Sequence, residues 1–139
     1  MKYYYSDVGL RNARLNFRQQ EENHIMENIL YNELRIRDFD VDVGIVTLNA
    51  RDESGKSKRI RHEVDFVANK GSQRYYIQSA FAIPDEDKRK QETASLNGIG
   101  DSFRKIVVVR ENIVPWHDNN GILYVSIEDF LLDERAIDM

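Results

Sequence analysis

The chain has 139 residues, of which 41% are hydrophobic and 32% charged, so it fits a single domain that buries a core and stays soluble. It has no cysteine, which excludes disulfides and thiolate chemistry, and it lacks the apolar runs of a membrane span or a signal peptide, so we expect a cytoplasmic protein. The net charge of −4 excludes a strongly basic nucleic-acid-binding protein but leaves room for a local basic patch.

The first half of the chain predicts a helix and three strands. Met26, Leu30 and Leu34 recur with helical spacing, and Asp38 ends this pattern. Alternating residues then predict a meander of strands in which Val64 and Phe66 share the apolar face. The expected elements are a helix over 18–37 and strands over 40–49, 59–68 and 74–81.

The second half of the chain predicts alternating helices and strands. Acidic residues after Pro84 favour a helix over 85–96. The β-branched run 106–109 is typical of a strand buried on both faces, and a further strand is expected over 122–125. Ser126 is placed to cap a C-terminal helix. The predicted fold class is therefore α/β, with helices around one central mixed sheet.

Carboxylates are the candidate catalytic groups of this sequence. It contains no phosphate-binding loop, no dinucleotide-binding glycine motif, no HExxH and no GxSxG. Asp65 and Glu63 lie on a predicted strand, and the hairpin that follows places residues 77–80 beside Asp65. Glu27 and Glu33 lie on the preceding helix, near its apolar side. A helix acid, a strand acid, and an acid with a lysine on the next strand would hold Mg²⁺ against a scissile phosphate.

Several segments together resemble a known family, the PD-(D/E)XK nuclease-like C-terminal domain of a bacterial P-loop ATPase family. The segments that carry the resemblance are Tyr3-Tyr4-Tyr5-Ser6-Asp7-Val8-Gly9-Leu10, Glu27-Asn28-Ile29 with Glu33-Leu34, Glu63-Val64-Asp65-Phe66-Val67, and Tyr76-Ile77-Gln78. The resemblance implies a restriction-endonuclease-like core with a mixed sheet of about five strands. It also implies that residues 1–139 are one nuclease-like domain, excised from the C-terminal end of a longer ATPase whose P-loop domain would be its partner.

The resemblance assigns the catalytic positions to Glu27, Asp65, Gln78 and Ala80. Gln78 stands where the family has a carboxylate, and Ala80 stands where it has the lysine. A neutral amide lacks the charge that offsets dehydration of Mg²⁺, and alanine cannot stabilise a developing phosphate charge. We therefore expect a degenerate, catalytically inactive domain that serves as a binding or regulatory module and needs no cofactor.

Two alternatives remain at this point. In the first, Glu27, Glu63 and Asp65 bind Mg²⁺ or Mn²⁺ and a migrated basic residue, Lys70 or Arg74, replaces the lysine. In the second, the domain mediates protein interaction or homodimerisation through an exposed strand edge or the loop that contains Trp116. Nucleic acid is a further expected partner, and its contact candidates surround the first hairpin: Lys56, Lys58, Arg59 and Arg61. Each acid can also be interpreted as a residue with a structural role and no catalytic one. Gln78 is most simply a strand amide that bridges its neighbours.

Overall fold

The computed structural model describes residues 7–51 and 53–139, with side chains placed for residue 18 and for 21–44, 53–59 and 63–139. The Tyr3–Tyr5 part of the family resemblance lies outside this description. The elements, in chain order, are α1 (Asp7–Ile36), β1 (Asp40–Arg51), β2 (Ser57–Lys70), β3 (Gln73–Ala80), α2 (Glu86–Asn97), β4 (Arg104–Val109), β5 (Trp116–His117), β6 (Leu123–Ser126), α3 (Ile127–Leu132) and a 3-10 helix, η1 (Ala136–Asp138).

The strands form one mixed sheet with the order β1-β2-β3-β4-β6-β5. β1, β2 and β3 are an antiparallel meander, β3, β4 and β6 run parallel, and β5 pairs antiparallel with β6. This confirms the predicted α/β class and the mixed sheet. The sheet has six strands rather than about five, because the two-residue strand β5 is too short to leave an alternating pattern.

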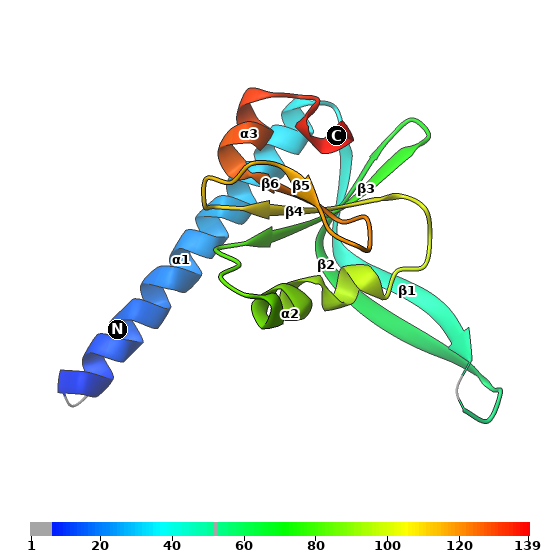
Figure 1. Cartoon of the computed structure of the whole chain (residues 1–139), viewed down its shortest axis with the longest axis horizontal. Helices are drawn as coiled ribbons and strands as arrows, with labels where there is room; N and C mark the ends of the chain where they lie inside the picture. The colour runs from blue at the N-terminus through cyan, green and yellow to red at the C-terminus, as the bar shows by residue number, and fades with distance from the viewer. Residues whose placement is uncertain (1–6, 52) are drawn as a thin grey trace.

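Helices cover both faces of the sheet (Figure 1), and each face has its own apolar cluster. On one face, Leu30 of α1 and Phe130 of α3 pack with the sheet, and on the other face Leu96 of α2 does so. Residues of β4 alternate between the two clusters, as the β-branched run predicts. Asp85 and Ser126 cap α2 and α3 through their side chains, which confirms the predicted helix starts. No helix in the described part of the chain combines the length and apolar character that crossing a bilayer requires.

Helix α1 begins eleven residues before the predicted start at Arg18, and its N-terminal part extends away from the sheet (Figure 1). The buried residues Met26, Leu30 and Leu34 form the predicted apolar stripe. Apolar periodicity predicts only the part of a helix that packs on a core. It therefore could not predict the N-terminal part of α1, which extends away from the sheet. The helix ends where expected, because Asp38 takes a left-handed φ of 66°.

A β-bulge interrupts the pairing of β1 with β2 at Asp65. Val43 pairs with Phe66 and the next residue, Gly44, pairs with Val64, so Asp65 has no partner on β1. Val64 consequently packs in the α2-side cluster, whereas Phe66 packs in the α1-side cluster. The prediction that these two side chains share one face is wrong, because the extra residue reverses the alternation.

Beyond the bulge, β1 and β2 form a two-stranded hairpin, which we call the β1–β2 arm (residues 44–64). The ladder between β2 and β3 extends only from Phe66–Ile77 to Lys70–Gln73, so the arm strands pair with each other and not with β3. Figure 1 shows this arm projecting from the rest of the sheet. The six-stranded body and the arm are therefore two structurally distinct parts of the same sheet.

Candidate functional site

The residues assigned to a catalytic site by sequence lie around one cleft, at the point where β2 and β3 separate. Two adjoining cavities of about 720 and 600 Å³ share three lining residues, Glu27, Asp65 and Gln78. Glu63 and Gly44, at the base of the arm, line the first cavity, and Ala80 lines the second. We call the two together the cleft. Elements α1, β2 and β3 thus bring together sequence-predicted residues that are up to 53 positions apart, from Glu27 to Ala80.

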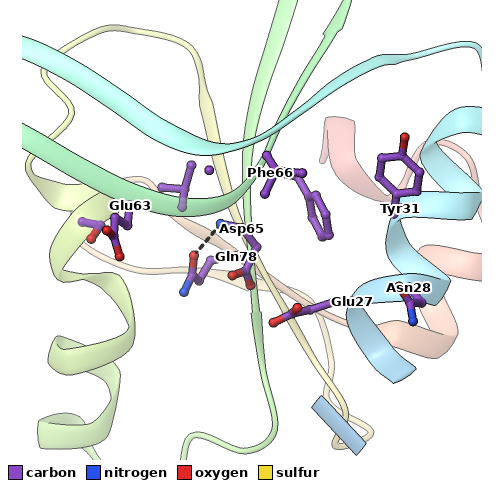
Figure 2. A pocket seen from close by; sticks show the side chains of 11 residues that line it. Glu27, Asn28, Tyr31, Glu63, Asp65, Phe66 and Gln78 are labelled. Atoms are coloured by element: carbon purple, nitrogen blue, oxygen red, sulfur yellow. Dashed lines mark hydrogen bonds between the residues drawn. The ribbon is translucent and has the colours of Figure 1, made fainter. Parts of the chain in front are cut away.

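Asp65 and Gln78 bind each other's strand by side-chain hydrogen bonds. The backbone N–H of Asp65 donates to Oε1 of Gln78 over 3.0 Å (Figure 2). In return, the Oδ2 atom of Asp65 accepts from the backbone N–H of Ser79 at 2.8 Å and from its hydroxyl at 2.7 Å. These bonds begin where the β2–β3 ladder stops, so they satisfy backbone donors that have no ladder partner where the two strands separate. The interpretation of Gln78 as a bridging strand amide is confirmed.

Ala80 is the C-terminal residue of β3, and its side chain is part of the apolar cluster under α2. Only 5% of its surface is exposed, and its methyl group forms part of the wall of the second cavity. A charged group is therefore absent at the position where the family resemblance expects the lysine.

Glu27 points from α1 toward Asp65 and Gln78 (Figure 2). Partial burial raises the pKa of the Glu27 carboxyl, the negative charge of Asp65 raises it further, and nearby His24 lowers it. The ring nitrogen Nδ1 of His24 lies 3.9 Å from the Glu27 carboxylate. Burial is thus the larger cause of the raised pKa, and the charge of Asp65 across the cleft acts in the same direction.

The secondary acid candidates are placed differently from Glu27. Glu63 is exposed and lies across the first cavity from Glu27 (Figure 2). Glu33 lines neither cavity and instead accepts a 3.0 Å hydrogen bond from Nε of Arg37. Arg37 is buried and also donates to the carbonyl oxygen of Phe130 at the C-terminal end of α3. Glu33 therefore anchors α1 to α3.

The basic residues expected as migrated replacements do not line the cleft. Lys70 donates from Nζ to the carbonyl oxygen of Arg37 at 2.9 Å, and Arg74 donates from Nε to Oδ1 of Asn69 at 2.8 Å. The basic residue that does line the second cavity is Lys88 of α2, whose Nζ lies 2.9 Å from a Glu92 carboxylate oxygen. In sequence, Lys88 belongs to a charged run typical of an exposed first helical turn, so only the packing of α2 places it in the cleft.

Carboxylates are the cleft side chains whose chemistry suits a divalent cation. Among the residues whose side chains are described, no three histidine, aspartate or glutamate side chains come together in a way that could hold a metal ion. Glu27, Glu63 and Asp65, the acids of the alternative site, line the first cavity together without forming such a cluster. Gln78, which offers a neutral oxygen, already uses that oxygen for the backbone of Asp65.

The basic nucleic-acid candidates lie on the arm and not in the cleft. Lys58 and Arg59 are exposed at the start of β2, and Lys56 is exposed in the turn before it. Arg61 is on the same strand, and its side chain lies outside the description. The sequence therefore contains two separate groups of candidates, the carboxylates of the cleft and the basic residues of the arm.

Comparison with known proteins finds a similar sequence of unknown function. No family model matches the chain. The chain is 30% identical over 131 residues to an uncharacterized protein of Haemophilus influenzae, a match that covers 94% of this chain and 28% of that protein. The chain thus spans less than a third of the length of this relative.

Proposed function

We propose that this chain is a nuclease-like domain with a restriction-endonuclease-like core that has lost catalysis and acts as a binding or regulatory module of a cytoplasmic P-loop ATPase. The resemblance in sequence motifs supplies the family and the ATPase partner. The greater length of the Haemophilus relative supports a role as one part of a larger protein.

The observation that carries the loss of catalysis is the hydrogen bonding between Asp65 and Gln78. The side-chain amide of Gln78 is neutral, and its oxygen accepts a hydrogen bond from the backbone N–H of Asp65. One carboxylate oxygen of Asp65 is likewise used by Ser79. Two residues at positions of a hydrolytic centre thus hold the separating strands together, and the third, Ala80, carries no polar group.

A cleavage assay on labelled single- and double-stranded DNA and RNA, with Mg²⁺ and with Mn²⁺, tests the proposal. We expect no cleavage above the buffer control. The matched variant is Asp65→Asn, which removes the charge and keeps an oxygen that can accept from Ser79. Cleavage by the wild type that this variant abolishes would show that the domain is an enzyme.

Calorimetric titration with Mn²⁺ tests the same cleft without relying on turnover. We expect no binding heat at metal concentrations on the order of millimolar, because two carboxylates and an amide bind a hard cation weakly. Gln78→Glu adds a third carboxylate and keeps an acceptor for the Asp65 N–H, so this variant should gain measurable heat. A wild type that binds as tightly as the variant contradicts the proposal.

Lys88 is the observation that favours cleavage as a second function. Lys88 lines the cavity that Asp65 and Ala80 also line, and its Nζ is paired with Glu92, which lines the same cavity. If the domain cleaves nucleic acid, Lys88→Ala should reduce the rate by about 10²–10³-fold, as for loss of one electrostatic donor. The control is Lys90→Ala, on the same helix and exposed, which should leave the rate unchanged.

A further inference from the structure

The β1–β2 arm concentrates positive charge in a chain that is negative as a whole. Residues 51–61, at its distal end, contain five basic and two acidic residues, whereas the chain has a net charge of −4. Lys58 and Arg59 are exposed and adjacent on β2, so in an extended strand their side chains point to opposite faces of the ribbon. Both faces of the distal arm therefore carry positive charge.

The base of the arm has the opposite charge. Exposed Glu63 lies at the base, and the carboxylates of Glu27 and Asp65 lie beside it in the cleft. These groups repel phosphates, whereas the distal basic residues attract them. A polyanion is thus directed to the distal arm and away from the cleft.

The composition of the arm favours a double-stranded ligand. Single-stranded nucleic acids are commonly held by stacking of bases on Phe, Tyr or Trp, and residues 44–64 contain none of these. Aromatic anchors are also typical of segments that insert into a lipid interface. A two-stranded β-ribbon, by contrast, fits the major groove of B-form DNA, which is about 12 Å wide.

From these observations we propose that the β1–β2 arm binds duplex DNA through the major groove, with Lys58 and Arg59 contacting phosphates on the two sides of the groove. The proposal gives the binding module of the preceding section a ligand. It places that ligand on the arm rather than in the nuclease-like cleft, and it therefore holds whether or not the cleft cleaves.

Fluorescence anisotropy of a labelled 20-base-pair DNA duplex tests the proposal, in EDTA to prevent cleavage and at several salt concentrations. The Lys58→Ala/Arg59→Ala variant should bind at least about tenfold more weakly at low salt. It should also lower the slope of log K against log salt by about 2, one for each lost phosphate contact. Glu53→Gln removes an exposed negative charge near the arm turn and should tighten binding.

The charge-matched control is Lys90→Ala/Arg135→Ala, which removes two exposed basic residues from α2 and from the segment after α3. It should bind the duplex as the wild type does. The proposal is overturned if the wild type does not bind the duplex, or if the control loses as much affinity as the arm variant. Tighter binding to a 20-nucleotide single strand, to an RNA duplex or to vesicles of phosphatidylcholine and phosphatidylserine would also overturn it.

Cleavage of the same duplex in Mn²⁺, followed on a gel, separates this proposal from the preceding one. Cutting together with arm-dependent binding would contradict the loss of catalysis and leave the arm proposal standing. Absence of both cutting and binding would contradict the arm proposal alone.

Discussion

Asp65 and Gln78 replace, with side-chain bonds, the ladder bonds that β2 and β3 lose beyond Phe66. The positions that the family resemblance assigns to a catalytic site here connect two strands. The change of role follows from chemistry: an amide oxygen is a good acceptor for a backbone N–H, and a carboxylate accepts from two donors at once.

Asp65→Ala should lower the free energy of unfolding by about 1–3 kcal/mol, because the backbone N–H and the hydroxyl of Ser79 lose their acceptor. Asp65→Asn keeps an acceptor oxygen and should lose less. Urea unfolding measures both. Glu63→Ala, at an exposed position on the same strand, is the control and should change stability by less than about 0.5 kcal/mol. Equal losses in Asp65→Ala and this control would show that the inter-strand bonds contribute nothing.

Glu27 makes stability depend on pH in a direction that follows from its raised pKa. The folded state holds the Glu27 proton more tightly than the unfolded state, whose value is near 4.5. The contribution of this group is therefore fully present below that pH and is lost as pH rises through the higher folded pKa. Glu27→Gln removes the titration, so the stability of this variant relative to the wild type should increase between about pH 4 and pH 7. Urea unfolding across that range checks this, and a constant difference would contradict it.

Local sequence patterns explain why part of the cleft could be predicted. The helical stripe of α1 orients Glu27, and the hairpin after Lys70 sets Gln78 beside Asp65, so both placements follow from short-range geometry. Lys88 could not be predicted in the same way, because it reaches the cleft only when α2 crosses between β3 and β4 and packs on the sheet. Long-range packing leaves no mark in the local pattern of charges.

The bulge in β2 is the element-level feature that joins the body, the cleft and the arm. It places Asp65 outside the β1 ladder, and it requires Gly44 opposite it, with a left-handed φ of 50°. A period of two in the sequence identifies strands and their faces, but an inserted residue changes the face without changing the local composition. The strand was therefore predicted correctly, and the side on which Val64 packs was not.

Gly44→Ala should destabilise the protein more than Gly55→Ala does. Both glycines have a positive φ, so alanine costs about 1–2 kcal/mol at either position. A Cβ at Gly44 would also lie 2.6 Å from the carbonyl oxygen of Val64, whereas nothing lies within 4 Å of a Cβ at Gly55. The Gly44 variant should therefore lose at least about 1 kcal/mol more in urea unfolding. Similar losses would mean that the backbone at the bulge shifts freely.

The molecule separates two tasks between its body and its arm. Apart from Gly44, Glu63 and Val64 at the base of the arm, the residues of both apolar clusters and of the cleft belong to the body. The arm strands pair only with each other, and the arm carries the basic residues near its turn. If this separation is correct, stability belongs to the body and DNA affinity to the arm, and each can be removed without the other.

Shortening the arm tests this separation directly. Thr47 pairs with Arg61, so residues 48–60 can be replaced by Asn-Gly, the two-residue turn that best connects such strands. The shortened protein should keep one cooperative unfolding transition and change its free energy of unfolding by less than about 1 kcal/mol, because a shorter loop is also cheaper to close. Circular dichroism during urea unfolding measures this, and anisotropy with the DNA duplex should show loss of binding. A protein that no longer unfolds cooperatively would show that the arm contributes to the core, and one that binds DNA unchanged would show that the ligand contacts the body.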